Sequence, residues 1–170
     1  MESASADLQV FAEVAVAFAG FSALVSVIGR RPGGDDPRAD SLRLRILVET
    51  ALIVVVFSLL PIALAKFPLS ELAVWRISSS VFILTGAIGS VINARRLRGQ
   101  SSLMTLADRI TLWLAWPLDI GQFSFLIVVA SGFWPDQSSA FYFAALYANL
   151  VMSALMFMRV AGSVLSQTEE

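Results

Sequence analysis

The sequence predicts an all-α protein, a single integral membrane domain over residues 1–170 built as a bundle of about five transmembrane helices. Hydrophobic residues make up 57% of the chain and charged residues 15%, whereas a soluble domain is about 45–50% apolar and about 25% charged. A soluble fold of this size could not bury the excess, because much of its surface stays in water. Five apolar stretches also reach the ~20 residues that a spanning helix needs.

The five stretches are predicted to be helices, because a backbone in lipid must satisfy its hydrogen bonds within its own segment. The first could be mistaken for a signal peptide, but acidic Glu2 and Asp7 precede it and Arg30 follows it. This charge order is typical of a helix that starts outside the cytoplasm. The predicted helices cover residues 8–29, 44–65, 72–94, 110–133 and 138–165.

Arginines are concentrated in two of the four connections, residues 30–43 and 95–109, which we expect to be cytoplasmic loops. The other two connections, residues 66–71 and 134–137, are short and carry a single basic residue, Lys66. The positive-inside rule therefore predicts an N-out/C-in topology, with which an odd number of spans agrees. Short links also make the second and third helices antiparallel neighbours, and likewise the fourth and fifth.

The residues that are missing exclude several classes of function. The chain has no Cys and no His, which excludes disulfides, thiol chemistry, His-based catalysis and the usual zinc, haem and iron–sulfur sites. The net charge of −1 gives no reason to expect a nucleic-acid partner. An aspartyl-type enzyme needs two carboxylates that share a proton, and Asp119 alone lies deep. We therefore expect no enzymatic activity, metal or cofactor.

Two ionisable residues of opposite charge lie at similar depths near the outer ends of their helices. Glu13 is about 7–8 Å into the first helix and Arg76 about 6 Å into the third. Because charges at membrane depth are costly unless they are paired, we expect a Glu13–Arg76 ion pair that clamps the two helices. Ser79 and Ser80 follow Arg76 by one turn and could extend this polar network inward.

The fourth helix carries a stripe of polar or small residues at spacings of three and four. Asp119 lies about 13–14 Å into this helix, near the middle of a ~30 Å hydrocarbon core, and the neighbouring Pro117 predicts a kink. Such a carboxylate could bind a cation or relay a proton. It could equally be a structural residue that hydrogen-bonds Asn149 on the fifth helix and locks two helices together. The stripe comprises Asp108, Thr111, Ala115, Asp119 and Gln122.

A second carboxylate, Glu49, lies near the predicted cytoplasmic boundary of the second helix, one turn after Arg45. The ordinary interpretation is an ion pair with Arg45, or with Arg95 or Arg96. The alternative is a carboxylate at the cytoplasmic mouth of a pathway.

Two segments of the sequence are similar to parts of known proteins. These are FAEVAVAFAGFS at residues 11–22, followed by the arginines at 30–31, and LRLRILVE at residues 42–49. Both resemble a widespread type of small bacterial multi-pass membrane protein. The resemblance covers roughly the first 95 residues, implies a location in the bacterial inner membrane and implies no particular activity.

These observations favour two functions. The first is a channel- or transporter-like pathway for an ion, a proton or a small solute. Five helices can barely enclose a pore, so this path would follow a homo-oligomer interface or symmetry axis. The second is a non-catalytic accessory or scaffold subunit, whose polar residues only hold helices together. Membrane lipids, further copies of the chain and other membrane subunits are the expected partners.

Overall fold

A computed structural model of the chain describes residues 2–28, 37–99 and 106–166. Within these ranges the chain forms five long helices and one short 3-10 helix, with no strand. All five long helices contain a segment long and apolar enough to cross a membrane, which confirms the prediction of an all-α protein with five helices of suitable length and composition. The elements are α1 Glu2–Ile28, α2 Pro37–Leu64, α3 Glu71–Gly99, α4 Leu106–Ser131, η2 Pro135–Gln137 and α5 Ser138–Ser166.

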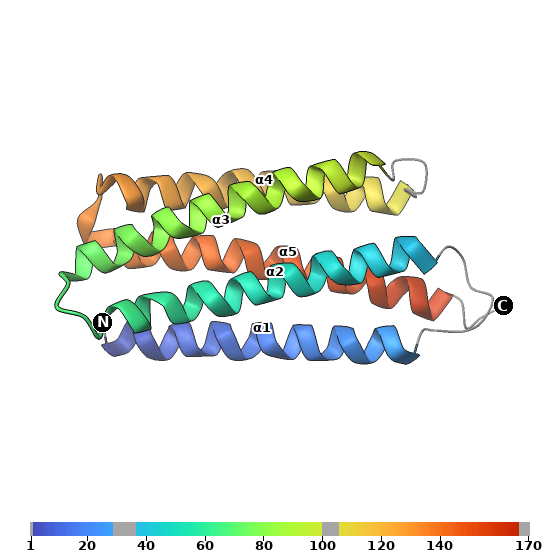
Figure 1. Cartoon of the computed structure of the whole chain (residues 1–170), viewed down its shortest axis with the longest axis horizontal. Coiled ribbons are helices and arrows are strands. Elements are labelled where there is room, and N and C mark those ends of the chain that lie inside the picture. The colour runs from blue at the N-terminus through green and yellow to red at the C-terminus, as the bar shows by residue number, and fades with distance from the viewer. Residues whose placement is uncertain (1, 29–36, 100–105, 167–170) are drawn as a thin grey trace.

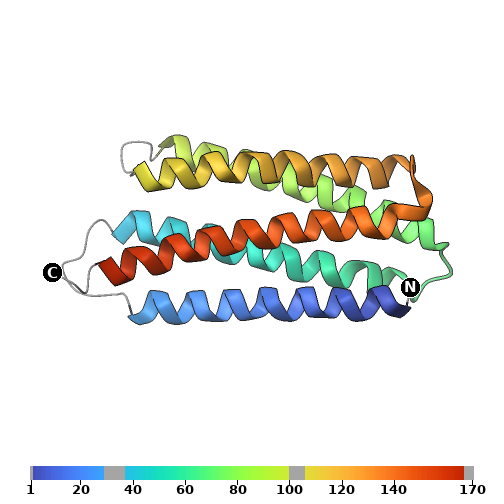
Figure 2. The same cartoon turned by 180° about the vertical axis from the view of Figure 1, so that it is seen from behind.

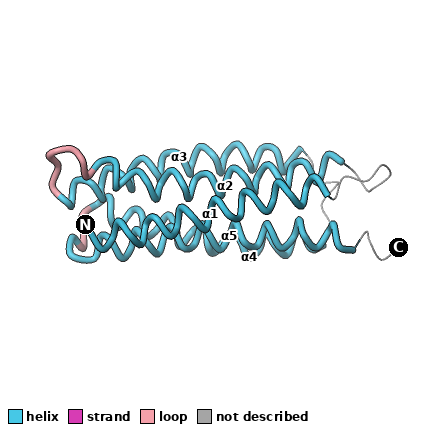
Figure 3. Tube along the Cα trace, turned by 90° about the horizontal axis from the view of Figure 1, so that it is seen from below, coloured by secondary structure: helices cyan, strands magenta, loops and turns pink. Residues whose placement is uncertain are grey.

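The five helices run antiparallel in chain order along one long axis (Figures 1 and 3). The start of α1, the α2–α3 connection and the α4–α5 connection share one end of the bundle, which we call the N-terminal end. The end of α1, the start of α2, the end of α3, the start of α4 and the end of α5 share the other, which we call the C-terminal end. The two arginine-rich connections predicted at 30–43 and 95–109 therefore belong to one end, although residues 29–36 and 100–105 lie outside the described ranges.

Helices α2 and α5 form the centre of the bundle. Helix α1 packs against both of them on one side, and α4 packs against α5 and α3 on the other. The views in Figures 1 and 2 agree that α1 and α3 lie on opposite sides of the central pair. The short links thus join antiparallel neighbours α2–α3 and α4–α5, as the sequence predicts.

The helix boundaries differ from the predicted ones at both ends of the bundle. Helix α1 begins at Glu2 rather than residue 8. Helix α2 begins at Pro37 rather than residue 44, and α3 continues to Gly99 rather than residue 94. Hydropathy marks only the apolar part of a helix, whereas polar and basic residues can continue its backbone hydrogen bonds beyond that part. Proline at the first turn of α2 is compatible with a helix start, because the N–H that it lacks would have no partner there.

An aromatic cluster from three helices fills the N-terminal half of the core. Phe57 of α2 and Phe82 of α3 stack with ring centroids 4.1 Å apart and planes 5° apart. Tyr142 of α5 packs against Trp75 of α3 at 5.3 Å and against Phe82 at 6.3 Å. All four side chains are at most 2% exposed, so they pack the junction of α2, α3 and α5 tightly.

The same junction supplies a hydrogen bond to a backbone carbonyl of α2 that has no partner within its own helix. Pro61 lies inside this helix and is fully buried. Because proline has no N–H, it cannot bond the carbonyl four residues earlier, that of Phe57. The hydroxyl of Tyr142 donates a 2.6 Å hydrogen bond to this carbonyl, which satisfies it from a neighbouring helix.

Burial along α3 changes at Phe82. The buried residues of α3 up to and including Phe82 are Val74, Trp75, Ser78, Ser79 and Phe82. From residue 83 to residue 95, none of the side chains is buried. The C-terminal half of α3 therefore packs only at its edge, and its large apolar side chains are exposed, with Leu84 at 64% and Ile88 at 54%. Such apolar exposure is expected of a helix surrounded by lipid or by another protein chain.

Candidate functional site

The predicted polar stripe of α4 meets α5 at one buried side-chain pair. The amide nitrogen of Asn149 donates to the amide oxygen of Gln122 at 3.2 Å. Gln122 is 2% exposed and Asn149 7%, so this hydrogen bond links two adjacent helices inside the bundle. The side-chain oxygen of Asn149 has no hydrogen-bond partner among the described residues. Ser153 donates to the Asn149 backbone carbonyl at 3.1 Å and continues the polar line along α5.

The expected hydrogen bond between Asp119 and Asn149 is not formed. Asn149 is paired with Gln122 instead, which lies one turn beyond Asp119 on α4. The Asp119 side chain is half-buried. Within the described part of the chain its carboxylate has no hydrogen-bond or ion-pair partner. Asp119 is therefore close to the buried pair but is not sealed by it.

Two of the remaining stripe residues lie at least partly inside the bundle. Ala115 is buried and Thr111 is half-buried. Asp108 lies within α4, and its side chain is outside the described part of the structure. Helix α4 is continuous through Pro117, from Leu106 to Ser131. Pro117 nevertheless removes the N–H that would bond the carbonyl of Trp113.

The structure corrects the expected Glu13–Arg76 ion pair. Glu13 is an exposed residue of α1, on the opposite side of the central helices from α3. Arg76 donates instead from Nε to the carbonyl of Ala130 at 3.0 Å. The sequence predicts similar depths for the two residues, but similar depth brings two side chains together only when their helices are neighbours.

Arg76 caps the C-terminal end of α4. Ala130 is in the last turn of that helix, where carbonyls lack intrahelical partners and the helix dipole favours a cation. The chain leaves α4 through Gly132, whose φ of +72° is in the left-handed region that favours glycine. A Cβ at Gly132 would lie 3.7 Å from the Arg76 side chain, so the guanidinium lies directly over this turn.

The two serines predicted to extend the Arg76 network behave differently from each other. Ser80 is exposed and donates to the Arg76 backbone carbonyl at 2.8 Å. Ser79 is fully buried, and its hydroxyl has no partner in the described structure. The side-chain network that the sequence suggests for these residues is therefore not present.

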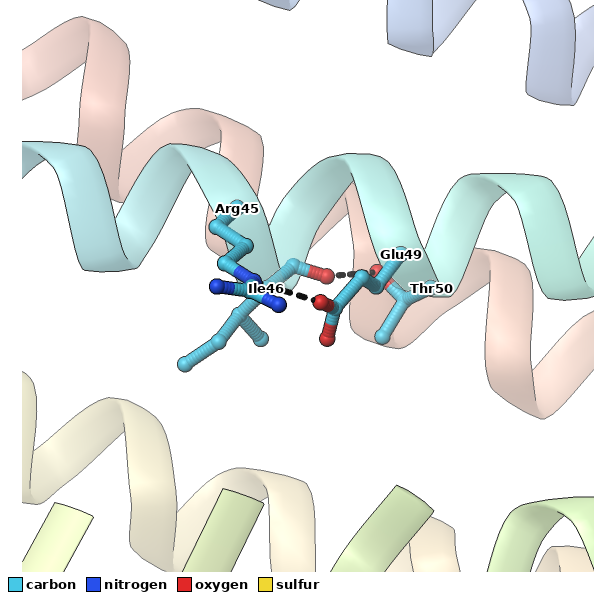
Figure 4. Close-up of polar contacts among 4 residues, drawn as sticks. All are labelled: Arg45, Ile46, Glu49 and Thr50. Atoms are coloured by element: carbon cyan, nitrogen blue, oxygen red, sulfur yellow. Dashed lines mark hydrogen bonds and ion pairs between the residues drawn. The ribbon is translucent and has the colours of Figure 1, made fainter. Parts of the chain in front are cut away.

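The predicted interaction of Glu49 with Arg45 is confirmed. Arg45 Nε lies 2.7 Å from Glu49 Oε1, with the side chains 61% and 37% exposed. In Figure 4 both side chains leave α2 on the side away from α1 and toward α3 and α4. Thr50 beside them donates to the Ile46 and Leu47 carbonyls of its own helix. Glu49 thus lies in the part of α2 near the C-terminal end of the bundle, on the side that faces α3 and α4.

Two features of the site were missed by sequence reasoning. One is the Tyr142–Phe57 hydrogen bond, for which Pro61 inside an apolar stretch was an available signal. The other is a group of fully buried serines without partners in the described structure, Ser58, Ser78 and Ser79. Sequence pointed to Ser79 as an inward-facing polar residue but gives no signal that these hydroxyls lack partners, because a serine in a helix normally bonds its own backbone.

The chemistry available in this arrangement is hydrogen bonding and proton transfer. Among the described residues, no three His, Cys, Asp or Glu side chains gather as a metal site would require. A half-buried carboxylate, a buried amide pair and several buried hydroxyls remain.

No protein-family model matches the sequence, and no curated protein or solved structure matches it.

Proposed function

We propose that the chain spans a membrane with its five long helices and provides a pathway for a proton or a small cation, with Asp119 at the middle of the path. The observation that carries this proposal is that the Asp119 carboxylate is half-buried and unpaired among the described residues. This carboxylate lies within the apolar segment Trp113–Ser131, about two turns from the start of that segment, and has no partner among the described side chains.

A carboxylate at this depth is costly in lipid, and such residues usually face a water-filled space, a partner charge or a substrate path. The one neighbouring amide that could have held it, Asn149, bonds Gln122. The carboxylate oxygens of Asp119 can therefore accept hydrogen bonds from water, bind a permeating cation or contact a second copy of the chain. A homo-oligomer would supply the second wall of the path, since five helices can barely enclose a pore.

The arrangement of the ends supports N-out/C-in insertion. The segments that carry most of the arginines share the C-terminal end of the bundle, while Lys66 and Arg76 lie toward the N-terminal end. The positive-inside rule puts the arginine-rich end in the cytoplasm. This orientation agrees with the bacterial inner membrane, which is the location that we propose.

The second candidate function is an accessory or scaffold subunit. The Asn149–Gln122 and Tyr142–Phe57 hydrogen bonds favour it, because both join neighbouring helices. Interhelical polar contacts of this kind stabilise membrane bundles without any transport role. They do not, however, account for Asp119, which takes part in neither contact.

Flux measurements separate the two functions. The purified chain is reconstituted in liposomes, and proton, potassium and chloride gradients are imposed in turn. A pathway dissipates at least the proton or the potassium gradient faster than empty liposomes do. A scaffold leaves all three gradients at the rate of empty liposomes, and that result would exclude the proposed function.

A further inference from the structure

Two groups of helical hydroxyls can be compared in the described part of the chain. In the first group, each hydroxyl donates to a carbonyl three or four residues earlier on the chain, which is the usual arrangement for serine and threonine in helices. Ser80, Ser124 and Ser131 are exposed examples, at 2.8 Å each. Ser153 is a buried one, at 3.1 Å. The group comprises Thr50, Ser80, Ser124, Ser131, Ser138 and Ser153.

The second group consists of Ser58, Ser78 and Ser79. These side chains are 0% exposed, and their hydroxyl oxygens have no hydrogen-bond partner in the described structure. A buried hydroxyl without a partner is costly, and native proteins almost always satisfy such groups with protein or with ordered water. Ser78 faces the Tyr142 hydroxyl, so Ser58 and Ser79 are the two hydroxyls that most clearly require another partner, such as bound water.

The three hydroxyls belong to the part of the bundle built around Tyr142. Ser78 and Ser79 lie on α3 between Trp75 and Phe82, whose rings both pack against the Tyr142 ring. Ser58 follows Phe57, whose backbone carbonyl accepts a hydrogen bond from the Tyr142 hydroxyl. All of these residues lie in the N-terminal half of the bundle.

The polar line continues from there toward Asp119. Asn149 follows Tyr142 by seven residues, which is about two turns or 10 Å along the same side of α5. Its unpaired side-chain oxygen is buried, and its amide nitrogen bonds Gln122. Asp119 precedes Gln122 by three residues on α4, so the two are neighbours on the helix surface.

We propose that these groups line a file of bound water molecules inside each protomer, and that this file carries protons between the N-terminal end of the bundle and Asp119. We call it the polar file, and it consists of Ser58, Ser78, Ser79, Tyr142, Asn149 and Gln122. The inference rests on the proposed function and narrows it: the permeant is a proton, and its path in this half runs through the protomer rather than between subunits.

The aromatic packing favours a proton, rather than a hydrated ion, as the permeant. The Phe57 and Phe82 rings are stacked 4.1 Å apart, and Trp75 packs 5.3 Å from Tyr142. An ion that crosses with its hydration shell would have to separate these rings. A proton needs only a chain of hydrogen bonds, in which each water or hydroxyl accepts one proton and donates another. Asp119 takes up a proton from one side and releases it to the other, so none is consumed.

The first test is thermal stability, which reports whether the buried hydroxyls are hydrated. Ser58→Ala and Ser79→Ala are compared with Ser80→Ala, in which a hydroxyl with its own backbone partner is removed. If water bonds the buried hydroxyls, each buried substitution lowers Tm by about 2–4 °C relative to the control. If the hydroxyls are dry and unpaired, their removal raises Tm, which would overturn the water file.

The second test is flux in liposomes. Ser78→Ala combined with Ser79→Ala should reduce proton flux about tenfold or more, while Ser80→Ala leaves it unchanged and potassium flux stays at the level of empty liposomes for every variant. Unchanged proton flux in the double variant, or potassium flux in the parent chain, would overturn the polar file but leave a pathway at Asp119 intact. Absence of flux in the parent chain would overturn the proposed function itself, whereas the Tm comparison would still report on hydration.

Discussion

The Tyr142 hydroxyl lies 2.6 Å from the Phe57 carbonyl and replaces the hydrogen bond that Pro61 removes from α2. This contact connects the two central helices at a point where one of them is chemically incomplete. In lipid the Phe57 carbonyl would otherwise have no partner, because the bilayer core holds no water to supply one. The proline therefore makes the interhelical contact necessary, and the tyrosine makes the proline tolerable.

Tyr142→Phe should lower the free energy of unfolding by about 1–3 kcal/mol, because it leaves a buried carbonyl without a donor. The loss should be smaller in a Pro61→Ala background, where an N–H returns at position 61. Unfolding followed by circular dichroism in mixed micelles measures all four proteins, with Tyr147→Phe at a 61% exposed position as the control. Equal losses in both backgrounds would show that the tyrosine does not serve the carbonyl that Pro61 leaves free.

Gln122→Leu should also destabilise the protein by about 1–3 kcal/mol, because it leaves the buried amide of Asn149 without its acceptor. Combining it with Asn149→Leu removes both polar groups and should recover part of that loss. The same unfolding assay applies, and the coupling between the two substitutions is the quantity of interest. Strictly additive effects would argue that the two amides do not meet.

Arg76→Ala should cost less than about 1 kcal/mol, because an exposed side chain loses a single hydrogen bond to the Ala130 carbonyl. A buried pair with Glu13 would instead cost about 3–5 kcal/mol when broken. Glu13→Gln combined with Arg76→Ala distinguishes the two cases in one double-mutant cycle. The structure predicts additivity, and a coupling above about 1 kcal/mol would restore the pair.

The insertion topology is tested with reporter fusions at the C-terminus. A reporter that is active only in the cytoplasm should give a signal there, and one that is active only in the periplasm should give none. The reason is the arginine content of the C-terminal end of the bundle. The opposite pattern would invert the proposed orientation and reverse the assignment of the two ends.

The helices could be predicted from the sequence because apolar length is a local property. Each span of about 20 residues is visible without knowing its neighbours. The ends of the helices could not, since the start of α2 at Pro37 and the end of α3 at Gly99 lie in polar sequence. In these segments the helical backbone hydrogen bonds continue beyond the last apolar residues, so hydropathy does not mark the helix end.

The side-chain contacts show where sequence reasoning stopped. The Arg45–Glu49 pair was predictable, because residues four apart on one helix are neighbours whatever the fold. The Glu13–Arg76 pair was wrong, because depth along two helices does not say whether those helices touch. Asn149 was correctly seen as an interhelical residue, but its partner is Gln122 rather than Asp119. That choice depends on how α4 and α5 are rotated against each other.

The most direct test of the account is proton flux through liposomes that contain the Asp119→Asn variant. Asparagine keeps the size of the side chain and removes its ability to take up and release a proton. Asp136→Asn makes the same chemical change at an exposed position in η2 and is the matched control. The account predicts that Asp119→Asn folds, forms the same oligomer as the parent chain and loses its proton flux, while Asp136→Asn conducts normally. Equal proton flux in the parent chain and in Asp119→Asn would contradict it.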